Sequence, residues 1–171
     1  MKKGVKAHTK RGQLKLSFGM IISIILIVIF LVFAFYAIKT FLGISDSAKT
    51  AKFVNNLQAG IDRVWKSAQS SQEQKYFLPS KIEYICFVDF FISEKGEKQH
   101  FYSELKRSYY GSENMVFYPF GSSDMDSREI KNIDLIEITQ DENPFCIQNT
   151  NGKPELTLVK EFDDALVTIT R

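Results

Sequence analysis

The longest apolar run in the chain lies near its N-terminus. From Phe18 to Ile38 no side chain is charged, and Ser23 is the one small polar residue. As an α-helix these residues would extend about 31 Å, which matches the hydrocarbon core of a bilayer. A helix in lipid satisfies its own backbone hydrogen bonds, so the β-branched content of this run is tolerated there. The pattern predicts a transmembrane helix over residues 18–42.

Two alternatives compete with a membrane anchor. A buried helix of a soluble protein is disfavoured, because the residues that follow are too few to enclose a helix that is apolar on every face. A cleaved secretory signal normally has an apolar core of about 7–15 residues followed by a small-x-small site. The run here is longer and continues through Tyr36, Lys39 and Phe41. We therefore favour an anchor that stays on the chain.

The next segment has the spacing of an amphipathic helix. Apolar residues recur there at steps of three and four, with polar and charged residues between them, and this predicts a helix over residues 45–74. Gly43 is either a joint or part of one helix that continues from the membrane, and residues 45–47 offer capping side chains. We interpret the stripe as packing on its own domain, and we also assign three of its residues to contact with neighbouring subunits. Those residues are Val54, Leu57 and Ile61.

The remaining pattern is rich in short strands. Segments dense in β-branched and aromatic residues predict strands at 81–92, 114–120, 133–139, 145–148, 155–160 and 165–170. A short helix is expected at 97–109, and the polar residues 149–152 read as a hairpin turn. One helix followed by antiparallel strands predicts an α+β fold, with the helix packed on a β-sheet head. We therefore divide the chain into residues 1–17, a transmembrane helix 18–42 and an α+β domain 43–171.

Charge separates the two sides of the apolar run. Residues 1–17 carry six basic and no acidic side chains, whereas residues 43–171 hold all 20 acidic residues of the chain and have a net charge of −5. The positive-inside rule then predicts a single-pass protein of the cell membrane, with a cytoplasmic N-terminus and residues 43–171 outside. The basic tail is explained by topology and by attraction to lipid headgroups, so we expect no nucleic-acid partner.

The cysteines are Cys86 and Cys146, and each lies in a predicted strand without metal-ligand spacing. Outside the membrane, two buried strand cysteines that face one another would oxidise to a disulfide. The alternative is two separate buried thiols.

Few residues offer chemistry for catalysis or metal binding. Of the two histidines, only His100 lies in the predicted external domain, and no nucleophile-elbow glycine pattern accompanies a serine. Residues 122–129 gather carboxylates, but they lack EF-hand spacing and its central glycine, so we favour a solvated loop or helix cap over calcium. The aromatic residues between 101 and 120 are expected mainly in the core, with an exposed patch as the alternative. We expect no enzyme activity, no metal and no cofactor.

The residues Lys10-Arg11-Gly12-Gln13, directly before the apolar run, resemble the processing site of archaeal type IV pilin-like proteins. The resemblance implies cleavage between Gly12 and Gln13 by a prepilin-type peptidase, with the apolar helix kept on the mature chain. The order of a basic leader, a span that continues into an amphipathic helix and a β-rich head covers the whole chain.

The fifth residue after the implied cut is Ser17, where members of that family usually have an acidic residue. That carboxylate is thought to meet the N-terminal amine of a neighbouring subunit, and a serine supplies no charge. We therefore expect an accessory, or minor, subunit of a surface filament or assembly machine, with the bilayer and other pilin-like subunits as partners. The alternative is a single-pass anchored domain that binds an unknown ligand outside the membrane and forms no filament.

Overall fold

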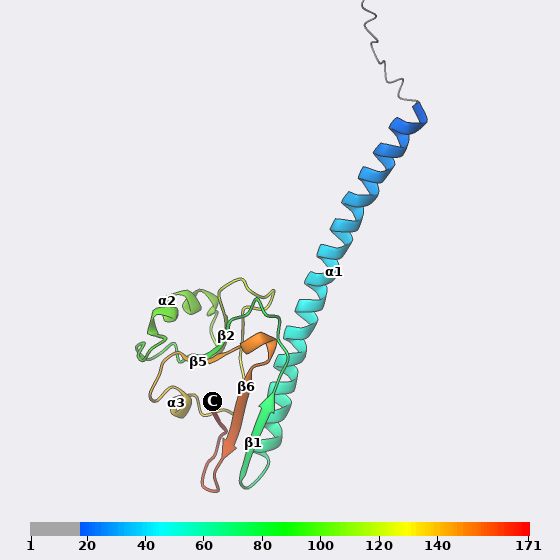
Figure 1. Ribbon diagram of the computed structural model, residues 1–171. Coiled ribbons are helices and arrows are strands. Elements are labelled where there is room, and N and C mark those ends of the chain that lie inside the picture. The colour runs from blue at the N-terminus through cyan, green and yellow to red at the C-terminus, as the bar shows by residue number, and fades with distance from the viewer. Residues whose placement is uncertain (1–17) are drawn as a thin grey trace, which may run out of the picture. The chain divides into compact units, whose positions relative to one another are not determined.

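The computed structural model describes residues 18–171, and its first element is one long helix. Helix α1 (Phe18–Trp65) has 48 residues without a break (Figure 1). The chain divides into two compact units, the first ending at Phe41 and the second covering Leu42–Arg171, which we call the head. Of the two alternatives for Gly43, the structure has the continuous helix, since Gly43 lies within α1. Predictions that fall on residues 1–17 lie outside the described residues.

Helix α1 ends nine residues earlier than residue 74, the end that the sequence predicted. Residues Ser70–Lys75 form strand β1 instead, and its side chains alternate between half-buried and exposed positions. The ammonium group of Lys160 donates to the backbone oxygens of Trp65 (2.7 Å) and Ser67 (3.0 Å). Carbonyl groups at a helix C-terminus lack partners within the helix, so this distant lysine helps the chain to turn into β1.

The strands form two antiparallel sheets. The first has the order β1-β6-β7, with β6 at Glu155–Lys160 and β7 at Thr168–Thr170. The second has the order β4-β3-β2-β5. Its strands are β2 (Tyr84–Phe87), β3 (Met115–Tyr118), β4 (Ser127–Arg128) and β5 (Phe145–Gln148). Together with α1 they make an α+β architecture.

Short helical segments join the strands. Helix α2 (Tyr102–Leu105) lies between the 3-10 turns Gln99–Phe101 and Lys106–Ser108, and this run corresponds to the helix expected at 97–109. Two further predictions were wrong. The strand expected at 133–139 is helix α3 (Leu135–Ile138), and the loop at 149–152, which contains the turn Thr150–Gly152, makes no hairpin. The strands that flank this loop, β5 and β6, belong to different sheets.

The second sheet is covered on both faces. One face joins the main core, where it meets the buried side of α1 and the first sheet. The other face packs under α2 in a second cluster, with Phe101, Tyr102 and Leu105 set against Val116 and the two cysteines. In Figure 1, α2 and α1 accordingly lie on different sides of β2 and β5.

Candidate functional site

The three residues that the resemblance singles out, Gly12, Gln13 and Ser17, lie outside the described residues. The structure therefore places neither the implied cut nor the fifth mature position. The candidate site that can be built from contacts is the part of α1 within the head, together with the loops bound to it.

The two cysteines form a disulfide. Cys86 of β2 and Cys146 of β5 are directly paired in the antiparallel register, and their Cα atoms are 4.0 Å apart. Both side chains are buried in the cluster under α2, at 0% and 3% exposure. The bond joins neighbouring strands of the second sheet and closes a loop with a sequence separation of 60 residues. The bond therefore links the two ends of the segment 86–146, which contains α2 and α3, within the second sheet.

The assignment of Leu57 and Ile61 to subunit contact is corrected by the structure. Both side chains have no exposed surface and lie in the head's own core, while Val54 is half-buried and packs against that core. A side chain enclosed by its own domain cannot also contact a neighbouring folded copy. The stripe therefore serves the packing of α1 on the head, which was the first interpretation of the pattern.

The close approach of α1 to the sheets depends on Gly60. A Cβ atom at this position would lie 3.2 Å from Leu158 of β6 and 3.3 Å from the hydroxyl oxygen of Tyr76. The ring of Tyr76 packs edge-on against Phe53, with 5.1 Å between centroids, and burial raises the pKa of Tyr76 to about 12. The tyrosine is therefore neutral at physiological pH and acts as a core residue that fixes α1.

A substitution in this stripe separates core packing from subunit contact. We expect Leu57→Ala to lower the free energy of unfolding of the head by about 2–5 kcal/mol, because it removes a fully buried side chain and leaves a cavity. Denaturant titration followed by the fluorescence of Trp65, the single tryptophan, measures this loss. The control Asn55→Ala, at an exposed position of the same helix, should change stability by no more than about 0.5 kcal/mol. A Leu57→Ala variant with unchanged stability and weakened self-association would reverse the correction.

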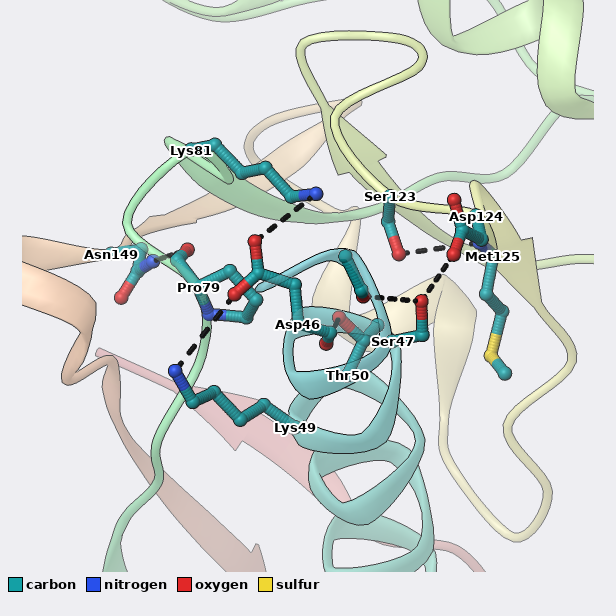
Figure 2. A network of polar contacts seen from close by, with 11 residues as sticks. Asp46, Ser47, Lys49, Thr50, Pro79, Lys81, Ser123, Asp124, Met125 and Asn149 are labelled. Atoms are coloured by element: carbon teal, nitrogen blue, oxygen red, sulfur yellow. Dashed lines mark hydrogen bonds and ion pairs between the residues drawn. The ribbon is translucent and has the colours of Figure 1, made fainter. Parts of the chain in front are cut away.

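Ion pairs attach the first turns of α1 within the head to a neighbouring loop (Figure 2). The Asp46 carboxylate forms ion pairs with Lys81 at 3.3 Å and with Lys49, one turn along the helix, at 3.8 Å. Asn149 holds the loop that carries Lys81, because its side-chain amide donates to the carbonyl oxygens of Pro79 (3.0 Å) and Ile82 (2.7 Å). One partly exposed carboxylate thus joins two lysines that come from different elements.

A second contact ties the same turns to residues 122–125. The Ser47 hydroxyl donates to the Asp124 carboxylate and also lies 3.0 Å from the carbonyl oxygen of Gly43. Asp126 accepts from the backbone N–H of Gly121 at 3.0 Å, so its carboxylate closes its own loop. No group of three or more metal-ligating side chains is present among residues 18–171. We call the set Asp46, Ser47, Lys49, Lys81 and Asp124 the Asp46 network.

Sequence reasoning missed this network. Asp46 and Ser47 were read as capping residues, whereas the structure has them inside a continuous helix, bound to loops far along the chain. Ser47 and Asp124 are separated by 77 residues in the sequence, a distance over which no local pattern carries a signal.

The aromatic residues at 101–120 are divided between core and surface. Phe101, Tyr102 and Phe117 are buried, whereas Tyr110 is 81% exposed. Phe101 stacks on Tyr118 with ring centroids 3.8 Å apart. His100 is exposed, and its Nδ1 lies 3.1 Å from the carbonyl oxygen of Glu97. The aromatic residues of this segment are therefore mainly packing residues, with Phe117 in the main core and Phe101 and Tyr102 in the cluster under α2.

Comparison with known proteins gives no family for the chain: no protein-family model, no curated protein and no solved structure matches it.

Proposed function

We propose that this chain is a membrane-anchored, pilin-like accessory subunit of a surface filament or assembly machine. The observation that carries the proposal is the difference between the two parts of α1. Its N-terminal part exposes large apolar side chains on every face, and its C-terminal part buries a stripe in the head. A helix that anchors at one end and forms the spine of a β-rich head at the other is the arrangement that the resemblance implies.

The apolar part of α1 supports a membrane location. It contains a stretch of 18 residues with a mean hydropathy of 3.2, none of it buried, which is long and apolar enough to cross a membrane. In water such a large exposed apolar surface would promote aggregation, whereas in lipid it contacts acyl chains that are equally apolar. The basic residues at 1–17 favour a cytoplasmic N-terminus, and the Cys86–Cys146 disulfide favours an oxidising location for the head.

The accessory role is proposed from Ser17. Because Ser17 supplies no carboxylate for the amine of a neighbour, self-assembly through that contact would be weaker than for an acidic subunit. An acidic pilin-like partner would provide the missing charge.

Leader processing tests the proposal. The intact mass of the chain extracted from membranes should correspond to a start at Gln13, because the cut after Gly12 removes the leader and keeps the helix. Gly12→Val should abolish the cut, since the peptidase site would lose its small residue. The matched control Gly4→Val, at the other glycine of residues 1–17, should leave it intact.

Crosslinking of the same membranes gives the second readout. A mature chain that crosslinks to another pilin-like subunit supports the accessory role. A chain that begins at Met1 in membranes and crosslinks to no such neighbour would contradict it, and the anchored binding domain would then be the better account.

A further inference from the structure

A basic surface with an exposed aromatic residue lies at the end of the head that begins with Leu42. It consists of Lys49 and Lys52 on α1, Lys81 and Lys153 on two loops, and Phe77 between them. Two adjoining hollows, of about 320 and 400 Å³, share Lys49 and Phe77 in their walls. Lys81 and Lys153 line the first hollow, and Lys52 lines the second. We call these five residues the Phe77 surface.

The backbone turns Phe77 outward. The N–H groups of Tyr76 and Leu78 donate to the carbonyl oxygens of Pro154 (3.1 Å) and Gly152 (3.0 Å), so residues 76–78 run as an extended segment beside 152–154. Side chains alternate along such a segment. Tyr76 and Leu78 are accordingly buried at 6% and 4% exposure, whereas Phe77 is 70% exposed. Its exposure therefore follows from the hydrogen bonds of its neighbours.

Lys153 is held beside Phe77 by a glycine. Gly152 has a φ of +74°, and a Cβ atom there would lie 2.8 Å from the carbonyl oxygen of Leu78. Only glycine allows this approach without a shift of the backbone. The segments 76–78 and 152–154, which carry Phe77 and Lys153 respectively, are thus held side by side.

The charge of the Phe77 surface is opposite to that of the head as a whole. Its four lysines face a single carboxylate, Asp46, which is shared by Lys49 and Lys81. Lys75 also lines the second hollow, but Glu155 at 3.0 Å and Glu73 at 3.7 Å pair with it, so it adds no positive charge. The four lysines and Asp46 together carry a net charge of +3, in a domain whose net charge is −5. An anionic partner fits this surface.

The position of the surface along α1 favours lipid headgroups as that partner. Leu42 and Lys49 are seven residues apart, which puts them on the same side of the helix at an axial separation of about 10 Å. Leu42 is an exposed apolar residue, so this side passes from apolar to cationic within two turns. Lysines near a membrane are attracted to anionic headgroups, and phenylalanine is among the apolar residues that enter the boundary between headgroups and acyl chains.

We propose that the Phe77 surface binds anionic lipid headgroups, with the lysines on the phosphates and Phe77 inserted among the headgroups. The inference rests on the proposed membrane anchor. Headgroup binding would give the chain a second attachment to the bilayer besides the helix anchor. This attachment would form before any assembly with other subunits.

Lysine protection in vesicles tests this proposal with the full chain. The protein is reconstituted into vesicles of phosphatidylcholine alone or with about one-third phosphatidylglycerol, and a membrane-impermeant reagent acetylates the lysines that face outward. Mass spectrometry then gives the modification of each lysine. We expect modification of Lys49, Lys52, Lys81 and Lys153 to fall by about threefold or more in the anionic vesicles, and to recover in high salt. Lys98 and Lys106, which lie over rings near α2, serve as internal controls and should not change.

Matched variants make the test specific. In the triple variant Lys49→Gln, Lys52→Gln and Lys81→Gln, Lys153 should lose its protection. In the control triple variant Lys98→Gln, Lys106→Gln and Lys131→Gln, Lys153 should remain protected from acetylation. Asp46→Asn should strengthen protection, because it removes the carboxylate that occupies Lys49 and Lys81.

Three results would overturn the proposal, and they are distinguishable. Equal modification in both vesicles, with the chain retained in both, contradicts headgroup binding alone. Protection that also occurs in pure phosphatidylcholine and rises with the protein-to-lipid ratio assigns the surface to the acidic side of another protein copy. A chain that does not float with either vesicle contradicts the anchor itself, and the headgroup proposal falls with it.

Discussion

Replacement of both cysteines by valine is expected to lower the free energy of unfolding of the head by about 4 kcal/mol. The Cys86–Cys146 bond closes a loop with a sequence separation of 60 residues, and removing it restores the conformational freedom of that loop to the unfolded chain. Valine keeps most of the apolar volume at two buried positions, so the loss reports the crosslink more than the packing.

Denaturant titration of the full chain in detergent measures this loss. Trp65 is a suitable reporter because its indole N–H donates to the carbonyl oxygen of Ala165 at 3.1 Å and its environment changes when the head unfolds. Reductant should lower the free energy of unfolding of the native chain by a similar amount and should leave that of the double valine variant unchanged. Equal midpoints for the native chain, the reduced chain and the variant would show that the bond does not stabilise the head.

The disulfide also indicates which structural features the sequence could predict. Strands 145–148 and 155–160 were predicted with the bounds that the structure has, because each is a compact run of strand-forming residues bounded by turn residues. The expectation that Cys86 and Cys146 pair is confirmed by their register. The α+β class followed from the change of hydrophobic period after α1. Each of these features has a signal within the segment concerned.

The errors occurred where distant contacts decide the local structure. Residues 133–139 have strand-like composition, yet Asp134 caps a helical turn by accepting from the N–H of Glu137, and its own N–H donates to Val167. Residues 70–74 continue a polar pattern that fits a helix face, but each of them pairs with a residue of β6. The Asp46 network was missed for the same reason, since Lys81 and Asp124 reach it from loops elsewhere in the chain.

Charged residues in the apolar run are expected to have the largest effect on the protein as a whole. In the double variant Ile29→Arg and Phe33→Arg, each arginine at the centre of a transmembrane helix costs about 2.5–3.5 kcal/mol for insertion. The two positions are one turn apart, and their side chains are 56% and 67% exposed in the structure. We therefore expect the variant to be lost from the membrane fraction after a carbonate wash, whereas the native chain should be retained.

The control is the variant Asn55→Arg and Ala59→Arg, which places the same charges one turn apart on an exposed face of α1 within the head. It should stay in the membrane fraction, because these positions face water in either form of the protein. If the 29/33 variant is retained as fully as this control, the apolar run is not in lipid and the anchored subunit is excluded. If only the 29/33 variant is lost and its head remains folded by Trp65 fluorescence, the two halves of α1 have separate roles: the first holds the chain in the bilayer, and the second supports the head.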